Sequence, residues 1–167
     1  SINFWIMTAD NTVLISGVST GIGLNCARYL LDRGWFVWGS VRKAEDASSL
    51  EADYPDQFSS LVFDVRDRGA MSIAVAKIQS SGRPLQALIN NAGIVVPGPI
   101  EYVEPKELKK QFDVNVIGLI ELTQLILPLL HQARENGVGP VRIINVSSIS
   151  GLISSPFVSL YSSSKFA

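Results

Sequence analysis

The sequence predicts a doubly wound α/β fold, in which a parallel sheet is covered by helices on both faces. Short β-branched runs alternate along the chain with longer segments of helical period. The short runs are almost continuously apolar, which is typical of strands that are buried on both faces. Turn residues separate the two kinds of segment at the spacing of strand–helix–strand units, whose crossovers are right-handed.

The first half of the chain contains three strand–helix units. We expect strands over residues 12–15, 36–41 and 60–65. Helices are expected over residues 21–33, 44–52 and 68–80. Gly34 follows the first of these helices, at the position where a glycine commonly ends a helix.

The second half of the chain contains two more expected strands, over residues 85–90 and 141–146. A proline-marked loop and a long helix lie between them. The helix begins near Pro105, because proline is tolerated in a first helical turn. Polar residues interrupt its apolar stretch over residues 114–130, so we expect a mostly buried helix rather than a membrane span.

Composition limits the partners and the compartment. The chain has 167 residues, a formal net charge of −1 and 47% apolar residues, which suits one domain with a core. No basic stripe is present, so nucleic acid is not an expected partner. The single cysteine, Cys26, excludes an internal disulfide and favours a reducing compartment, here the cytoplasm. We expect Cys26 to pack as a small apolar residue of a helix.

The first seven residues, Ser1–Met7, lack the basic start and the length of a secretory signal. They are either vector-derived or upstream residues before an initiating Met7, or a native apolar arm. No repeat, low-complexity tract or linker follows them. Residues 8–167 are therefore expected to form one continuous domain.

A glycine-rich turn joins the first expected strand to the first expected helix. A dinucleotide site needs one glycine for the tight turn, one where the backbone approaches the pyrophosphate and one for close helix–strand packing. Gly17, Gly21 and Gly23 supply these roles in that order. Free N–H groups at the helix N-terminus then face the phosphates. The spacing GxxxGxG differs from the general GxGxxG fingerprint, and a turn without a nucleotide is the alternative.

The residues around this turn resemble the TGxxxGIG motif of the short-chain dehydrogenases/reductases, with Ser16 in place of the usual threonine. Residues 90–93 are similar to a second motif of that family, NNAG, which alone would be read as a plain turn. The resemblance implies a Rossmann-like fold. It also implies that the cofactor is bound by Gly17, Ser19, Thr20, Gly21, Ile22, Gly23, Asn90, Ala92 and Gly93.

The end of the second expected strand distinguishes NAD(H) from NADP(H), because a carboxylate there binds both ribose hydroxyls and repels a 2′-phosphate. Alignment with the family places Val41 at that position and Arg42 directly after it. Arg42 either pairs with a phosphate, helped by the Ser19 hydroxyl and the positive charge of Lys43, or is a solvated loop residue. We therefore expect NADP(H), with NAD(H) as the second choice. The resemblance further implies that Asp64 contacts the adenine ring, with Val65 beside it.

We expect Ser148, Tyr161 and Lys165 to be the catalytic residues. Tyr161 and Lys165 are four residues apart, so on a helix they share one face. Interconversion of an alcohol and a carbonyl needs a group that exchanges a proton with the substrate oxygen, and free tyrosine, which titrates near about pH 10, is a weak base at neutral pH. A lysine ammonium one turn away favours the phenolate. Ser148 can hold the substrate oxygen and stabilise its developing charge.

The spacing of these three residues is similar to that of the family's serine and YxxxK motifs. Ser148 lies thirteen residues before Tyr161, and the YxxxK motif runs from Tyr161 to Lys165. Ser147 is the adjacent alternative, but the thirteen-residue spacing selects Ser148. The resemblance therefore implies that Tyr161 and Lys165 both contact the cofactor and that both take part in catalysis.

The resemblance implies that Asn115 completes a catalytic tetrad at a bend of the long helix, where it holds a water near Lys165. Gly118 could help that bend. The alternative for Asn115 is a helix residue that is hydrogen-bonded to the backbone. His131, the only histidine, is expected at the surface, and no metal-ligand cluster is expected.

The family's fold continues past the helix of Tyr161 and Lys165, so we expect its C-terminal strands and helices to be missing from this chain. That would leave an apolar sheet edge exposed. Residues 154–158 and 165–167 are similar to the hydroxysteroid and retinol dehydrogenase branch, which implies a bulky, apolar alcohol or ketone substrate. The resemblance also implies a homodimer or homotetramer formed through the long helix. A non-catalytic nucleotide-sensing protein and a Rossmann-like methyltransferase are the alternatives, but neither needs both Tyr161 and Lys165.

Overall fold

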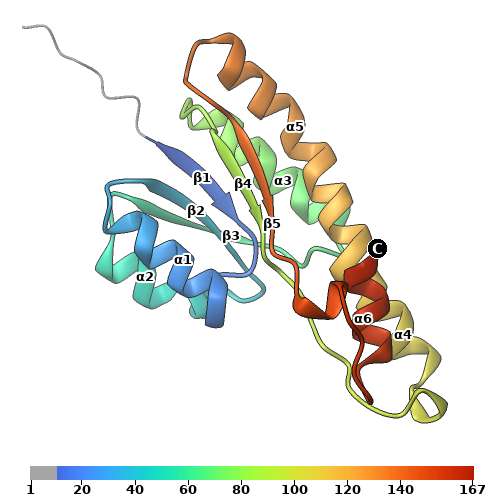
Figure 1. The fold of residues 1–167 in the computed structure, drawn as a ribbon. Coiled ribbons are helices and arrows are strands. Elements are labelled where there is room, and N and C mark those ends of the chain that lie inside the picture. The colour runs from blue at the N-terminus through green and yellow to red at the C-terminus, as the bar shows by residue number, and fades with distance from the viewer. Residues whose placement is uncertain (1–10) are drawn as a thin grey trace, which may run out of the picture.

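Five parallel strands lie side by side in the order β3-β2-β1-β4-β5, with helices on both faces of the sheet (Figure 1). This computed structural model describes residues 11–167, so the expectation for Ser1–Met7 lies outside the described residues. The doubly wound α/β fold predicted from the sequence is confirmed. The central position of β1, flanked by β2 and β4, is where the strand order reverses direction, and ligands of such sheets bind at this switch point.

The elements begin and end close to where the sequence patterns place them. The strands are β1 Thr12–Ile15, β2 Phe36–Val41, β3 Phe58–Val62, β4 Ala87–Asn90 and β5 Arg142–Asn145. The helices are α1 Gly21–Leu31, α2 Ser48–Asp53, α3 Arg68–Ser80, α4 Pro105–Phe112, α5 Leu119–Glu135 and α6 Ser159–Phe166. The short helical turns are η1 Ala44–Ala47, η2 Ile100–Tyr102 and η4 Ile149–Gly151, and a π-helical segment, η3 Asp113–Gly118, joins α4 to α5.

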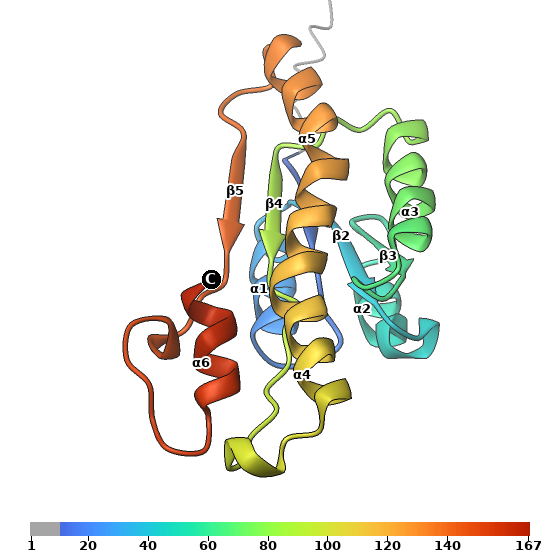
Figure 2. The ribbon, with the colours of Figure 1, turned by 90° about the vertical axis from the view of Figure 1, so that its right-hand side faces the viewer.

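Two apolar cores cover the two faces of the sheet. Successive side chains of a strand point to opposite faces, so Val13 and Ile15 join one core while Leu14 joins the other. The core of Val13 also contains residues of α1 and α2, and the core of Leu14 contains residues of α3 and α5. Figure 2 shows α5 and α3 on the second face. Burial on both faces explains the continuous apolar runs of the strands.

The third strand ends earlier than expected. It pairs with β2 from Val37 opposite Phe58 to Val41 opposite Val62, and β2 itself ends at Val41. Residues beyond Val62 therefore have no strand to pair with, apart from one hydrogen bond from the Phe63 N–H to the Val41 carbonyl. Because the ladder stops there, residues 63–65 turn away at the carboxyl edge of the sheet.

The long helix is buried on one face only, which corrects the expectation of a mostly buried helix. By length and composition, the 31-residue span from Pro105 to Glu135 is the one helix of residues 11–167 that could cross a membrane. Leu122 and Ile126 are fully buried in the core on the α3 side of the sheet, whereas Ile117 and Ile120 are about half exposed. This is the packing of a helix that covers a sheet.

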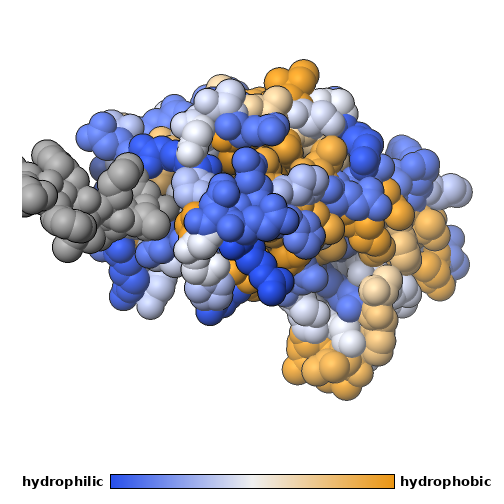
Figure 3. Space-filling model, turned by 90° about the horizontal axis from the view of Figure 1, so that it is seen from above, coloured by the Kyte–Doolittle hydropathy of each residue, from blue (hydrophilic) through white to orange (hydrophobic). Residues whose placement is uncertain are grey.

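Strand β5 forms an open edge of the described sheet. It pairs with β4, and its four residues are all exposed, including Ile143 and Ile144. Apolar side chains are also exposed at the surface in the view from the amino-terminal ends of the strands (Figure 3). The predicted exposure of an apolar sheet edge is therefore observed.

Candidate active site

The glycine-rich turn follows β1 and adopts a backbone that side chains disfavour. Gly17 has φ +74° and Gly21 has φ +60°, both in the left-handed region. A Cβ atom on Gly23 would overlap the Gly17 carbonyl oxygen and the Asn91 amide, so α1 can lie this close to the turn only with glycine there. No atom lies within 4 Å of a Cβ built on Gly21, which leaves that stretch of backbone open to a ligand.

The β2 side of the sheet holds the turn in place through Ser40. The Gly17 N–H donates to Ser40 Oγ at 2.9 Å, and the Val18 N–H donates to the Ser40 carbonyl at 2.9 Å. Ser40 is buried within an otherwise apolar strand. A lone small polar residue near the end of a buried strand was the signal that could have identified this contact.

The β4 side holds the turn through Ser16 and Asn91. Ser16 Oγ accepts the N–H groups of Asn91 and Ala92, each at 3.0 Å. The Asn91 side chain donates back to the carbonyls of Ser16 and Gly17, each at 2.9 Å. The serine that replaces the family's threonine therefore supplies the hydroxyl that joins the two motifs.

A pocket of about 320 Å³ opens at the carboxyl edge of the strands, beside this turn. Most of the expected cofactor residues line it, namely Gly17, Ser19, Thr20, Ile22, Arg42, Asp64, Val65, Ala92 and Gly93. Asn91 of the NNAG motif lines it as well, and so do six residues that were not predicted from the sequence, namely Ser40, Phe63, Arg66, Ile94, Lys110 and Val114. The pocket lies at the switch point between β1 and β4, as expected for this fold class.

Gly21, Gly23, Tyr161 and Lys165, which were expected at the cofactor, do not line this pocket, and neither does Asn90. Its buried side chain donates to Thr123 Oγ1 at 3.0 Å and to Asn145 Oδ1 at 2.9 Å, so it ties β4 to α5 and β5. The period of two along a strand explains the difference, because adjacent residues face opposite ways and Asn91 takes the pocket side.

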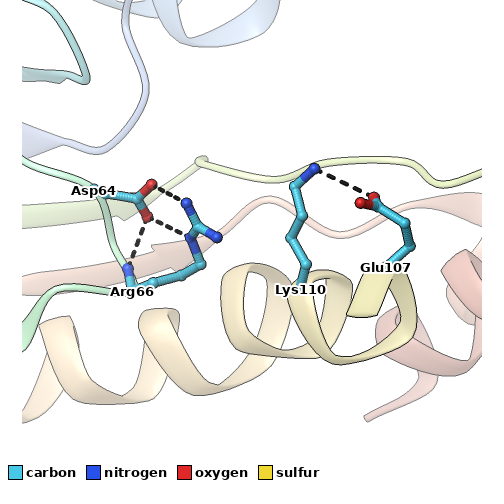
Figure 4. A network of polar contacts seen from close by, with 4 residues as sticks. All are labelled: Asp64, Arg66, Glu107 and Lys110. Atoms are coloured by element: carbon cyan, nitrogen blue, oxygen red, sulfur yellow. Dashed lines mark hydrogen bonds and ion pairs between the residues drawn. The ribbon is translucent and has the colours of Figure 1, made fainter. Parts of the chain in front are cut away.

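Three cationic side chains line the pocket, Arg42, Arg66 and Lys110. Arg66 pairs with Asp64 through its Nε and Nη2 atoms at 3.0 and 2.6 Å, and Lys110 pairs with Glu107 at 3.2 Å (Figure 4). The hydrogen bonds from Arg66 lower the pKa of Asp64, outweighing the opposing effect of its partial burial, and Arg42 lowers it further.

No carboxylate stands at the end of β2. Val41 is 2% exposed and lines the pocket, and the exposed Arg42 follows it directly. Glu45, which is the next acid along the chain, lies in η1 and pairs with Lys43 at 4.0 Å. The end of β2 therefore presents an apolar and a cationic side chain to the pocket and no carboxylate.

Helix α6 presents Tyr161 and Lys165 on one face, next to the pocket. Lys165 Nζ lies 5.9 Å from the centre of the Tyr161 ring and donates to the Val146 carbonyl at 2.9 Å. A Cβ atom built on Gly93 would lie 4.0 Å from Lys165 Nζ and 3.5 Å from Asn115 Oδ1. The lysine therefore adjoins the pocket wall that Gly93 forms.

Ser148 begins the short turn that packs against α6. Its Oγ accepts the Ser150 N–H at 3.1 Å and so caps η4. A Cβ atom on Gly151 would lie 2.5 Å from the Lys165 carbonyl oxygen, which shows how closely η4 approaches α6. Ser148 is partly buried in this arrangement, whereas Ser147 is exposed.

Asn115 lies within the π-helical segment η3, at the position where a bend of the long helix was predicted. Its side chain contacts the backbone of Ile94 and the hydroxyl of Ser164. Gly118 ends the segment, and a Cβ atom there would lie 2.6 Å from the Val65 carbonyl oxygen. The glycine thus permits close contact with the loop after β3. His131 is exposed, and residues 11–167 contain no cluster of potential metal ligands.

Known proteins resemble this chain along its length. A family model described as short chain dehydrogenase matches residues 11–167. An NADPH-dependent 3-dehydrocapnine reductase of Ornithobacterium rhinotracheale is 41% identical over 156 residues, which are 92% of this chain and 55% of that protein. A 3-ketodihydrosphingosine reductase of Bacteroides thetaiotaomicron is 33% identical, over 93% of this chain and 53% of that protein.

Solved structures show the same fold. A short-chain dehydrogenase from Streptomyces avermitilis has a TM-score of 0.88 and 31% identity, over 97% of this chain and 58% of its own. A gluconate 5-dehydrogenase from Burkholderia cenocepacia, in complex with NADP and tartrate, has a TM-score of 0.83 and 28% identity, over 94% and 61% of the two chains. The chain spans about half the length of the curated relatives it matches.

Proposed function

The chain belongs to the short-chain dehydrogenase/reductase family, and we therefore propose that it interconverts an alcohol and a ketone with NADP(H) as the cofactor. One observation carries the proposal. Tyr161 and Lys165 share one face of α6, and the Lys165 ammonium adjoins the pocket wall at Gly93. A lysine with a tyrosine ring beside it therefore adjoins a pocket that has the features of a dinucleotide site.

The pocket residues fit a dinucleotide that carries a 2′-phosphate. Gly17 and Gly21 provide a left-handed backbone that lets a pyrophosphate approach closely, at the N-terminus of the eleven-residue α1. Arg42 supplies a planar, permanently charged group for a phosphate, and Val41 offers no carboxylate to repel it. The NADPH dependence named for the 3-dehydrocapnine reductase and the NADP in the gluconate 5-dehydrogenase structure support this preference.

Each catalytic side chain has a separate task. Tyr161 gives a proton to the carbonyl oxygen in reduction and takes it back in oxidation. Lys165 places its positive charge beside the Tyr161 ring and stabilises the phenolate. Ser148 donates a hydrogen bond to the substrate oxygen as negative charge develops there. NADP(H), when bound, supplies or accepts the hydride at the substrate carbon.

The substrate that we propose is a bulky, apolar alcohol or ketone. Leu152, Ile153 and Phe157 are exposed, with 78%, 60% and 63% of their surface accessible, in the segment between Ser148 and Tyr161. This segment begins with η4, which Ser148 caps, and its Phe157 carbonyl accepts a hydrogen bond from the Gly98 N–H. The family resemblance of residues 154–158 supports the same substrate class.

We also propose a cytoplasmic protein that assembles as a homodimer or homotetramer. Cys26 is the single cysteine and stays unpaired, which suits a reducing compartment. Leu108, Ile117 and Ile120 are 44% to 48% exposed along the α4–η3–α5 span, which a self-complementary contact would cover.

Replacing Tyr161 by phenylalanine tests the proposed reaction. The change removes one oxygen, so NADPH binding, followed by fluorescence titration, should persist. The rate of NADPH oxidation with a panel of steroid ketones, retinoid carbonyl compounds and small ketones should fall by about 10²–10⁴-fold, which is the usual rate enhancement from a positioned proton donor. Near-normal turnover in Tyr161→Phe would disprove the role of Tyr161. Absence of NADPH binding by the wild-type protein would disprove the cofactor assignment.

A further inference from the structure

Two buried amide side chains hold the segment that follows the NNAG motif. Gln111 is fully buried and Asn115 is 5% exposed, and they lie one helical turn apart. Gln111 Oε1 accepts the Val96 N–H at 2.7 Å, and Asn115 Oδ1 accepts the Ile94 N–H at 2.9 Å. The two amides therefore bind alternate residues of the same extended segment, which continues directly from the pocket wall at Gly93.

The same two amides converge on one hydroxyl of the catalytic helix. Gln111 Nε2 and Asn115 Nδ2 donate to Ser164 Oγ at 3.3 and 2.9 Å. Ser164 in turn donates to the Tyr161 carbonyl at 2.7 Å. A serine hydroxyl has one proton and two acceptor sites, so all three are in use.

The backbone determines which way both amides point. The N–H groups of Ile94 and Val96 can only donate, so the oxygen atoms of Asn115 and Gln111 must face them. The amide nitrogens then face Ser164, whose own proton must go to the Tyr161 carbonyl. The network therefore has a single consistent assignment of donors and acceptors.

This cluster joins three elements whose relative positions the reaction depends on. Residues 94–96 continue the cofactor wall, α4 and η3 carry the two amides, and α6 carries Tyr161 and Lys165. Figure 2 shows α6 beside α4, and the two helices are in contact.

We propose that Gln111 and Ser164 are positioning residues that hold Tyr161 at its working distance from the bound cofactor. Neither side chain is assigned to contact substrate or cofactor. Ser164 accepts hydrogen bonds from both amides and donates one to the Tyr161 carbonyl. These bonds fix the position of α6 relative to the pocket wall that residues 93–94 form. The inference rests on the proposed function, because it assigns these residues to the same proton transfer.

The test is a double-mutant cycle in the full-length protein. Ser164→Ala removes the shared hydroxyl, and Gln111→Met removes the amide while keeping an unbranched side chain of similar length. Ser164→Thr restores a hydroxyl. Ser163→Ala is the matched control, because Ser163 is exposed on the same helix and its hydroxyl donates to the Ser159 carbonyl within that helix.

The kinetic readout is kcat for NADPH-dependent ketone reduction beside the dissociation constant of NADPH. Ser164→Ala and Gln111→Met should each lower kcat by about 10- to 100-fold, the scale of a small displacement of a catalytic group. NADPH affinity should stay within about threefold of wild type, because the turn that binds phosphate is untouched. The double variant should be no worse than the poorer single variant, since both changes break one network. Ser164→Thr should recover activity, and Ser163→Ala should match wild type.

Two kinetic results would overturn the inference. One is additive losses in the double variant, and the other is an equal loss of kcat in Ser163→Ala and Ser164→Ala. If the wild-type protein reduces no ketone with NADPH, the proposed function fails instead. Amide hydrogen exchange then tests whether the network couples α6 to residues 94–96. Ser164→Ala should speed exchange in both α6 and residues 94–96, whereas unchanged exchange there would refute the coupling.

Discussion

At the scale of single residues, the proposed preference for NADP(H) depends on the end of β2. Arg42 lines the pocket from an exposed position, so its guanidinium can reach a 2′-phosphate without a large cost of desolvation. We expect Arg42→Ala to weaken NADPH binding by about 1.5–3 kcal/mol, the usual contribution of a charged hydrogen bond. NADH binding should hardly change, and both are measurable by fluorescence titration.

Two further variants separate this role from a general effect of charge. Val41→Asp places an acid at the ribose position and should shift preference toward NAD(H) by about 1–3 kcal/mol. Lys43→Ala removes a neighbouring positive charge that pairs with Glu45 and lies outside the pocket lining, so it should leave the preference unchanged. Equal affinity of the wild-type protein for both cofactors would contradict the assignment.

The Asp64–Arg66 pair predicts a dependence of stability on pH. The Arg66 hydrogen bonds lower the pKa of Asp64 in the folded state, so folding favours the ionised carboxylate. The pair therefore stabilises the protein above the pKa of free aspartate, about 4, and this contribution is lost as the pH falls through the lower folded-state value. The free energy of unfolding, measured with urea between about pH 2 and about pH 6, should fall less steeply toward acid pH in Asp64→Asn than in wild type.

A carboxylate without this partner provides the comparison. Asp56 is exposed in the loop before β3, so Asp56→Asn should leave the acid limb of the unfolding curve close to that of wild type. A similar flattening in both variants would mean that the Arg66 contact contributes nothing specific.

At the scale of elements, the π-helical segment η3 depends on the absence of a side chain at Gly118. Alanine favours a helix over glycine by about 1 kcal/mol, which alone would make Gly118→Ala stabilising. A Cβ atom there would lie 2.6 Å from the Val65 carbonyl oxygen and 2.9 Å from Val65 Cβ, however, and neither belongs to a flexible chain end. We expect the overlap to dominate and the variant to lose about 1–3 kcal/mol of unfolding free energy.

Chemical denaturation of two glycine variants checks this balance. Gly69, in the first turn of α3, has only an Asp67 carboxylate oxygen near a built Cβ, at 3.3 Å. Gly69→Ala should therefore be neutral or stabilising. If Gly118→Ala is as stable as wild type, η3 does not depend on close contact with the loop after β3.

At the scale of the whole molecule, the exposed apolar face of the long helix predicts self-association. Ile117 and Ile120 lie one turn apart on the surface, and an apolar face of this kind is covered in a symmetric dimer. Ile120→Lys should shift the full-length protein toward monomer in sedimentation at micromolar concentration. Ile73→Lys on α3, at a position that is 76% exposed, is the control and should leave assembly unchanged. A wild-type protein that is already monomeric would disprove the expectation.

The sequence by itself determined the fold class, the order of elements and most of the pocket. Those features depend on local rules, because the period of apolar residues, the spacing of glycines and the four-residue interval from Tyr161 to Lys165 are readable from neighbouring positions. Bounds were exact for β1, β2 and α3, where pattern and turn residues agree. Strand β3 was misplaced because its end depends on its partner β2, which runs out at Val41.

Only the tertiary structure decided which polar side chains serve the site and which serve the fold. Asn90 and Asn91 are adjacent and identical in type, yet one faces α5 and the other faces the pocket. Ser40, Gln111 and Ser164 resemble ordinary polar residues in the sequence, because the hydrogen bonds that connect them to the site join residues 15 to 53 positions apart. A hydrogen bond between distant segments depends on where packing brings the two backbones together, and no local pattern encodes that distance.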